Sequence, residues 1–171
     1  MPSLILGVGN VLLSDDGAGV HAARSLADSL AGRPDVQVLD GGTLSFSLAP
    51  LIEDADRLVL IDAAELGEAP GSVRCLFGEE IERFLGRARL SVHEVGLRDM
   101  LEIARLADAL PLERALIGIQ PATLDWGLEP SSAVAAGIAQ AVQLALRLVE
   151  EWPVAAAPLC ARPSRCVREG G

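Results

Sequence analysis

Residues 3–20 read SLILGVGNVLLSDDGAGV, and this stretch decides the fold. Its first six residues, Ser3–Val8, form a short apolar run that favours a buried strand. Glycines follow at once, and a helix is predicted from about Asp15 to Leu30, with Ser14 as its N-cap. A strand that leads through a glycine turn into a helix is typical of the first unit of a layered α/β domain.

Similar apolar runs recur along the chain and alternate with helical patterns. Further strands are expected at Val36–Leu39, Leu58–Ile61 and Ala115–Ile119, with a half-exposed edge strand at Ser72–Phe77. Helices are expected after His93 and from Ser131 or Ser132 to Trp152. The alternation predicts an α/β domain with a mainly parallel sheet and helices on both faces, so its site should lie at the carboxyl ends of the strands.

Length and composition narrow the class of protein. The chain has 171 residues, which favours one domain, expected over residues 1–152 with a loose tail at 153–171. It carries 24 acidic and 14 basic residues and a net charge of −10, so nucleic acid and anionic membranes are poor partners. No apolar run reaches the roughly 20 residues of a membrane span, and no signal peptide is expected. Three cysteines are too few for a disulfide scaffold, so a reducing cytoplasm is the expected compartment. The protein is expected to be a monomer.

Acidic side chains stand where two of the predicted strands end. Asp16 follows the first strand at the start of the first helix, and Asp62 comes directly after Leu58–Ile61. If the first and third strands are neighbours, these two carboxylates lie side by side in the crevice. Two close carboxylates repel each other, so either one is protonated or a cation sits between them.

His93 favours the interpretation in which a cation sits between the two carboxylates. Taken alone, a histidine at this position would more often be structural. It is expected in a loop before a helix, within reach of the strand ends. With the two carboxylates it forms a mixed oxygen and nitrogen set that suits a divalent ion such as zinc or nickel. The other histidine, His21, lies one position off the apolar row of the first helix and is expected on the surface.

A nucleotide site is another interpretation of the first glycine turn, because Asp40 closes the second strand where a ribose-binding acid would sit. Against it, the third glycine of that motif would fall at Leu12, and Asp15 and Asp16 would repel a phosphate. The turn at residues 40–43 is either simply tight or a place where another chain approaches closely. The cysteines lack the spacing of a zinc site.

Taken together, the motifs resemble those of the hydrogenase maturation endopeptidases, from about Leu4 to Trp152. They are GVGNVLLSDDGAGV at 7–20, LDGGT at 39–43, LIDA at 60–63, PGSVR at 70–74, SVHEVGL at 91–97 and IGIQP at 117–121. The resemblance implies a three-layer fold whose mixed, mainly parallel five-stranded sheet has an antiparallel edge strand. It also implies an endopeptidase that trims the C-terminal extension from the large-subunit precursor of NiFe hydrogenases.

The same resemblance assigns roles to particular residues. Asp16, Asp62 and His93 would bind nickel that the substrate already holds, with zinc or cadmium as possible substitutes. Asp40, Gly41, Gly42 and Thr43 would form the substrate loop. Asp16 or Asp62 would activate the attacking water, and which of them does so is open, as is a metal held permanently by the enzyme. A non-catalytic nickel-binding accessory protein of hydrogenase assembly is the alternative function.

Overall fold

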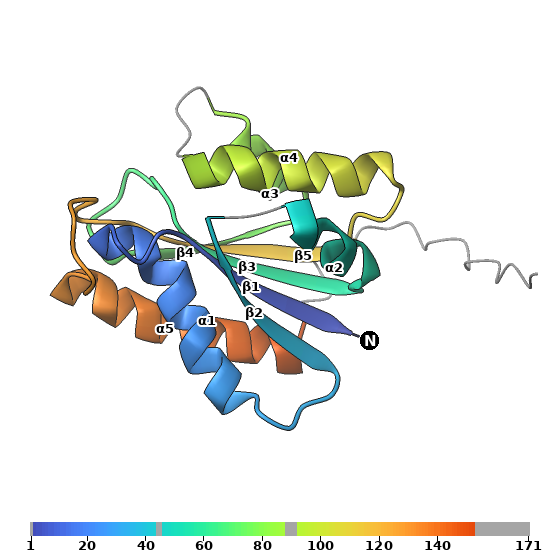
Figure 1. Cartoon of the computed structure of the whole chain (residues 1–171), viewed down its shortest axis with the longest axis horizontal. Coiled ribbons are helices and arrows are strands. Elements are labelled where there is room, and N and C mark those ends of the chain that lie inside the picture. The colour runs from blue at the N-terminus through green and yellow to red at the C-terminus, as the bar shows by residue number, and fades with distance from the viewer. Residues whose placement is uncertain (1, 44–45, 88–91, 153–171) are drawn as a thin grey trace, which may run out of the picture.

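The computed structural model describes residues 2–43, 46–87 and 92–152, and the side chains of Phe46 and of residues 92–95 lie outside the described part. Five strands form one sheet in the order β2-β1-β3-β5-β4 (Figure 1). They are β1 Ser3–Val8, β2 Val36–Gly42, β3 Arg57–Ala63, β4 Val73–Phe77 and β5 Glu113–Ile119. Neighbouring strands run parallel, except that β4 is antiparallel to β5. The predicted mixed sheet and its antiparallel edge strand are confirmed.

Helices cover both faces of the sheet, which confirms the three-layer arrangement (Figure 1). One face carries α1 Ala18–Ser29 and α5 Ser132–Glu150. The other carries α2 Ala49–Asp54, α3 Glu79–Leu85 and α4 Val92–Leu106. Two short 3-10 helices, η1 Ser14–Gly17 and η2 Phe46–Leu48, precede α1 and α2. The sequence did not predict α2, α3 or η2.

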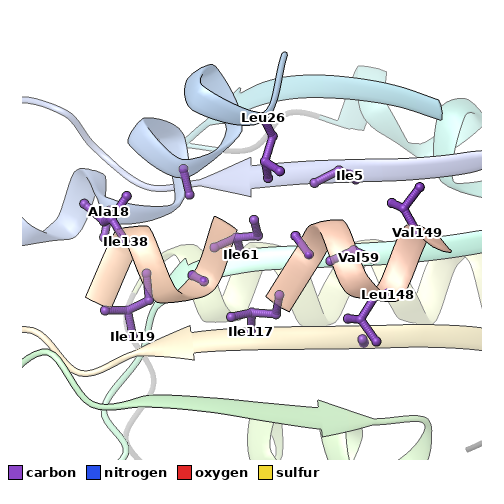
Figure 2. Close-up of a cluster of buried hydrophobic side chains, with 14 of the residues drawn as sticks. Ile5, Ala18, Leu26, Val59, Ile61, Ile117, Ile119, Ile138, Leu148 and Val149 are labelled. Carbon is purple, nitrogen blue, oxygen red and sulfur yellow. The ribbon is translucent and has the colours of Figure 1, made fainter. Parts of the chain in front are cut away.

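The central strands are apolar throughout because each of their faces contacts a helical layer. Figure 2 shows Ile5, Val59, Ile61 and Ile117 packed against Ala18 and Leu26 of α1 and Ile138, Leu148 and Val149 of α5. The alternate residues, such as Leu58 and Leu60, pack against α4 on the opposite face. By length and composition α5 could cross a membrane, but its buried row lies on the sheet, as in the core helix of a globular domain.

Three predicted element boundaries are wrong. The first helix does not run from Asp15 to Leu30, because a 3-10 turn comes first and Ser14, at φ 45°, makes no N-cap bond. The second strand does not end before residue 40, because β2 continues through Gly42 and pairs with β1 across an irregularity at Gly7 and Val8. The last helix ends at Glu150, short of Trp152. The predicted tail at 153–171 lies outside the described residues.

The order of the strands places a topological switch point at their carboxyl ends. From β1 the chain crosses one face through α1 to reach β2, and it then returns across the other face through α2 to β3, on the far side of β1. The connections therefore diverge to opposite sides of β1, and folds of this kind bind their ligands at such a point, here between the ends of β1 and β3. This is the place where Asp16 and Asp62 were expected to meet.

Candidate active site

Glycines bring the start of α1 into contact with the ends of β1 and β3. A Cβ on Gly19 would lie 2.1 Å from the carbonyl oxygen of Ile61 and 2.4 Å from that of Val8. A Cβ on Gly9, which has a φ of +138°, would lie 1.9 Å from the carbonyl oxygen of Asp16. Only glycine allows backbones to approach this closely. The glycines of the first motif thus set the position of η1 at the switch point.

Two buried carboxylates lie at this switch point, where the sequence predicts them. Asp16, 5% exposed, lies in η1 and accepts a 3.0 Å hydrogen bond from the backbone N–H of Asn10. Asp62, 1% exposed, is the second-last residue of β3 rather than the first residue after it. By strand alternation its side chain shares the face of Leu58 and Leu60, which α4 covers. Because η1 contacts β3, the two acids come from adjoining elements.

His93 was expected in a loop before a helix, and that expectation is wrong. It lies in the first turn of α4, on the side of the sheet to which Asp62 belongs. Its side chain lies outside the described part, so the predicted third ligand is placed by its backbone alone. Among the described side chains, no three His, Cys, Asp or Glu residues gather closely enough to hold a metal ion. The set of Asp16, Asp62 and His93 therefore stays a prediction.

Asp15 is a structural residue of the site that sequence reasoning missed. Its buried carboxylate accepts hydrogen bonds from the N–H groups of Ala122, at 2.8 Å, and Thr123, at 3.0 Å. The N–H and hydroxyl of Ser131 also donate to it, at 2.6 and 2.9 Å. Burial alone would raise the pKa of Asp15, but these donors outweigh it and hold the pKa below its ordinary value. Asp15 thereby ties η1 to the loop before α5.

Other supporting residues could have been found from their polarity at strand ends. The side-chain oxygen of Asn10 accepts the N–H of Leu12 at 3.0 Å and so shapes the turn that leads to Asp16. The buried side chain of Gln120, directly after β5, accepts the N–H of Leu66 at 2.7 Å and holds the loop that follows β3. Both residues stand in the quoted motifs GVGN and IGIQP. Their role is to fix backbone around the switch point.

The predicted substrate loop is only partly a turn. Asp40, Gly41 and Gly42 belong to β2, and Thr43 follows as an exposed turn residue. Asp40 lies on the α1 face, where Arg24 pairs with it at 2.9 Å, and its other oxygen accepts the N–H of Gly42. Its carboxylate is thus directed to the opposite face of the sheet from Asp62. A substrate role for residues 40–43 stays a prediction.

The structure corrects the expectation for His21 and argues against a chemical role for Cys75. His21 was expected on the surface, but it is half-buried and its Nε2 atom is covered by protein. Burial, with a smaller contribution from the charge of Glu80, raises the pKa of the Cys75 thiol to about 12. Cys75 therefore stays protonated at neutral pH and is a poor nucleophile.

Comparisons with known proteins agree with this fold. A family model described as hydrogenase maturation protease matches residues 20–148, a range that includes Asp62 and His93 and begins just after Asp16. The chain is 37% identical over 152 residues to the hydrogenase expression/formation protein HupD of Bradyrhizobium diazoefficiens, covering 88% of this chain and 79% of the relative. It is 32% identical over 159 residues to the hydrogenase 2 maturation protease of Escherichia coli, covering 92% and 96%.

Solved structures agree as well. The hydrogenase maturating endopeptidase HybD from E. coli superposes with a TM-score of 0.79 at 31% identity, covering 88% of this chain and 93% of that one. The [NiFe] hydrogenase maturation protease HybD from Thermococcus kodakarensis superposes with a TM-score of 0.75 at 38% identity, covering 86% and 99%. The chain therefore belongs to the hydrogenase maturation protease family and is an endopeptidase of hydrogenase maturation.

Proposed function

We propose that this endopeptidase removes the C-terminal extension of the NiFe hydrogenase large-subunit precursor after nickel has been inserted. In this proposal Asp16, Asp62 and His93 bind the nickel that the precursor holds. The observation that carries the proposal is the pair of buried carboxylates that come from adjoining elements at the switch point of the sheet. Two oxygens and one imidazole leave coordination positions open for ligands from the substrate, and zinc or cadmium can replace nickel in such a set.

The same residues supply the hydrolysis. A carboxylate at the switch point takes a proton from the water that attacks the scissile carbonyl carbon, and it returns a proton to the leaving amine. Asp16 and Asp62 are both candidates for this base, which makes the enzyme an aspartyl-type protease. The nickel then positions the extension for cleavage, since a precursor without nickel cannot hold its extension at the two carboxylates. We place the reaction in the cytoplasm, with the protease as a monomer.

The test is incubation of the full chain with nickel-loaded and nickel-free precursor, followed by intact-mass measurement of the large subunit. We expect the mass of the extension to be lost only from the nickel-loaded form. His93→Ala should abolish this loss, whereas His21→Ala, a matched change in α1, should leave it nearly intact. Efficient trimming of nickel-free precursor would contradict nickel recognition. Failure to trim the nickel-loaded form would contradict the choice of substrate.

A further inference from the structure

An exposed apolar patch lies beside the candidate site. It consists of Leu12, in the turn after β1, and of Leu124, Trp126 and Leu128, in the loop between β5 and α5. Trp126 is 82% exposed, whereas the chain's other tryptophan, Trp152, is buried. In Figure 1 the β5–α5 loop, in orange, and the turn before α1, in dark blue, lie at the same end of the molecule. Clustered apolar side chains on a surface of this kind mark interaction sites.

The two segments that carry the apolar patch are fastened to each other. The N–H of Gly127 donates to the carbonyl oxygen of Leu12 at 3.0 Å, and the N–H of Ser14 donates to that of Gly127 at 2.8 Å. The hydroxyl of Ser14 donates to the carbonyl oxygen of Asp125 at 3.0 Å. Asp15 holds the start of the same loop through Ala122 and Thr123.

This fastening has an energetic consequence. The backbone beneath Trp126 is already ordered before any partner binds, so docking costs little conformational entropy there. Tryptophan also offers a large contact area with few rotatable bonds, and it is enriched among residues that dominate binding energy.

Charge indicates the chemistry of the partner. Residues 1–23 and 115–146 contain no Arg or Lys, while Asp125 and Glu129 flank Trp126 in the loop. The partner should therefore present an apolar surface bordered by basic side chains. The partner should sit next to the candidate site, because Asp15 binds the loop that carries Trp126 and directly precedes Asp16 in the chain. A protein whose chain end reaches the candidate site would cover the apolar patch at the same time.

We propose that the apolar patch is a docking surface for the folded body of the protein substrate, separate from the site that takes its extension. The inference rests on the proposed function, because the occupant is the precursor whose extension is cut. The patch anchors the precursor while the carboxylates engage the reacting region. Removing Trp126 therefore weakens substrate binding and leaves the bond-breaking step as it was.

The experiment is steady-state trimming of nickel-loaded precursor by the full-length protease. Trp126→Ala should raise KM about tenfold or more and leave kcat unchanged, and Trp126→Phe should restore most of the lost affinity. Higher ionic strength should also raise KM. The matched control is Leu106→Ala, because Leu106 is 87% exposed but ends α4, about 20 Å of helix away from its first turn. Leu106→Ala should leave both constants unchanged.

Several outcomes would overturn the docking surface. An unchanged KM in Trp126→Ala, with the wild type active, would overturn it and leave the proposed function intact. If the wild type trims nothing, the proposed function fails. The docking surface is then tested by itself: analytical sedimentation measures how tightly the precursor binds to the wild type and to Trp126→Ala. Equal binding by the two proteins would overturn it. A wild-type dimer that Trp126→Ala dissolves would instead assign the apolar patch to a second copy of this chain.

Discussion

The two ends of the sheet differ in the burial of their acidic side chains. At the amino end, acidic side chains pair with arginines: Arg57 with Glu113 on the neighbouring strand, and Arg33 with Asp35 just before β2. At the carboxyl end, three acids are buried, namely Asp15, Asp16 and Asp62. Much of this end is formed by residues 1–23 and 115–146, which contain no Arg or Lys. There Asp15 is compensated by backbone N–H groups and a hydroxyl rather than by an arginine.

This difference separates ion pairs that lie partly in solvent from carboxylates that lie inside the protein. An exposed ion pair contributes little to stability and tolerates change. A buried carboxylate is costly unless donors or a cation compensate it, so its presence at a crevice points to a function. We therefore expect changes in the partly exposed ion pairs of the amino end to alter stability slightly, and changes in the buried acids of the carboxyl end to alter activity or stability strongly.

The largest effect is expected for Asp62→Asn. The change keeps the shape of the side chain but removes the charge of a proposed nickel ligand and candidate base, so trimming of the nickel-loaded precursor should fall about 1,000-fold. The melting temperature should stay equal or rise, since removing one of two neighbouring carboxylates relieves repulsion. The control is Glu113→Gln at the amino end, which should leave the trimming rate unchanged. A marked fall in the melting temperature of Asp62→Asn would mean that Asp62 is structural.

The next largest effect is expected for Gly19→Ala. The added Cβ would meet the carbonyl oxygens of Ile61 and Val8 at 2.1 and 2.4 Å, so the start of α1 must move. Urea denaturation should show a loss of about 3 kcal/mol in the free energy of unfolding. Gly32→Ala, in the turn between α1 and β2, adds its Cβ to open space at a φ of +87° and should cost about 1 kcal/mol. Equal costs would contradict the close approach at the carboxyl end.

Asp15→Asn should cost about 2 kcal/mol of stability at pH 7, because the carboxylate loses its charge-assisted hydrogen bonds. The folded-state pKa of Asp15 is lowered, so its contribution is fully present above the unfolded pKa of about 4 and is lost as pH falls through the folded pKa. The stability gap between wild type and variant should therefore narrow below about pH 4. Thermal melts between pH 3 and pH 7 measure it.

The matched control for that experiment is Asp35→Asn. Its hydrogen bond to Arg33 lowers the pKa of Asp35 to about 2, but the group is fully exposed to solvent. The melting temperature of the Asp35→Asn variant should barely differ from that of the wild type at pH 3 or at pH 7. A gap for Asp15→Asn that stays constant with pH would mean that the hydrogen bonds accepted by Asp15, and not its charge, stabilise this loop.

The smallest effect is expected for Arg57→Met, which removes the cross-strand pair with Glu113 and keeps most of the apolar stem. Both side chains are partly exposed, and Arg57 also lies 5.8 Å from the ring centre of Trp152. The free energy of unfolding should fall by about 1 kcal/mol or less, and trimming should be unaffected. A larger loss would show that this pair stabilises the strand ends more than an ordinary partly exposed ion pair does.

The sequence predicts the sheet well because its signals are strong. The runs in β1, β3 and β5 are apolar on both faces, and β4 is half-buried along its whole length at the edge of the sheet. The positions of Asp16 and Asp62 follow from those strands alone, since parallel strands bring their carboxyl ends together.

Other features depend on tertiary packing and were missed. Helices α2 and α3 have six and seven residues, too few for a clear period, and they are held by buried side chains such as Ile52 and Phe84. The glycines of Asp40–Gly42 disfavour a strand, yet pairing with β1 keeps them in one. The bonds of Asp15 join residues more than a hundred positions apart, which no local pattern shows.

That long separation also sets an order of events during synthesis. The carboxylate of Asp15 finds its donors 107 to 116 residues later in the chain, and β5 enters the sheet between β3 and the earlier strand β4. A nascent chain that has exposed only its first half can form β1, β2 and β3, but it cannot fasten the turn that bears Asp16. The turn that bears Asp16 is therefore fastened only after the segment before α5 has left the ribosome.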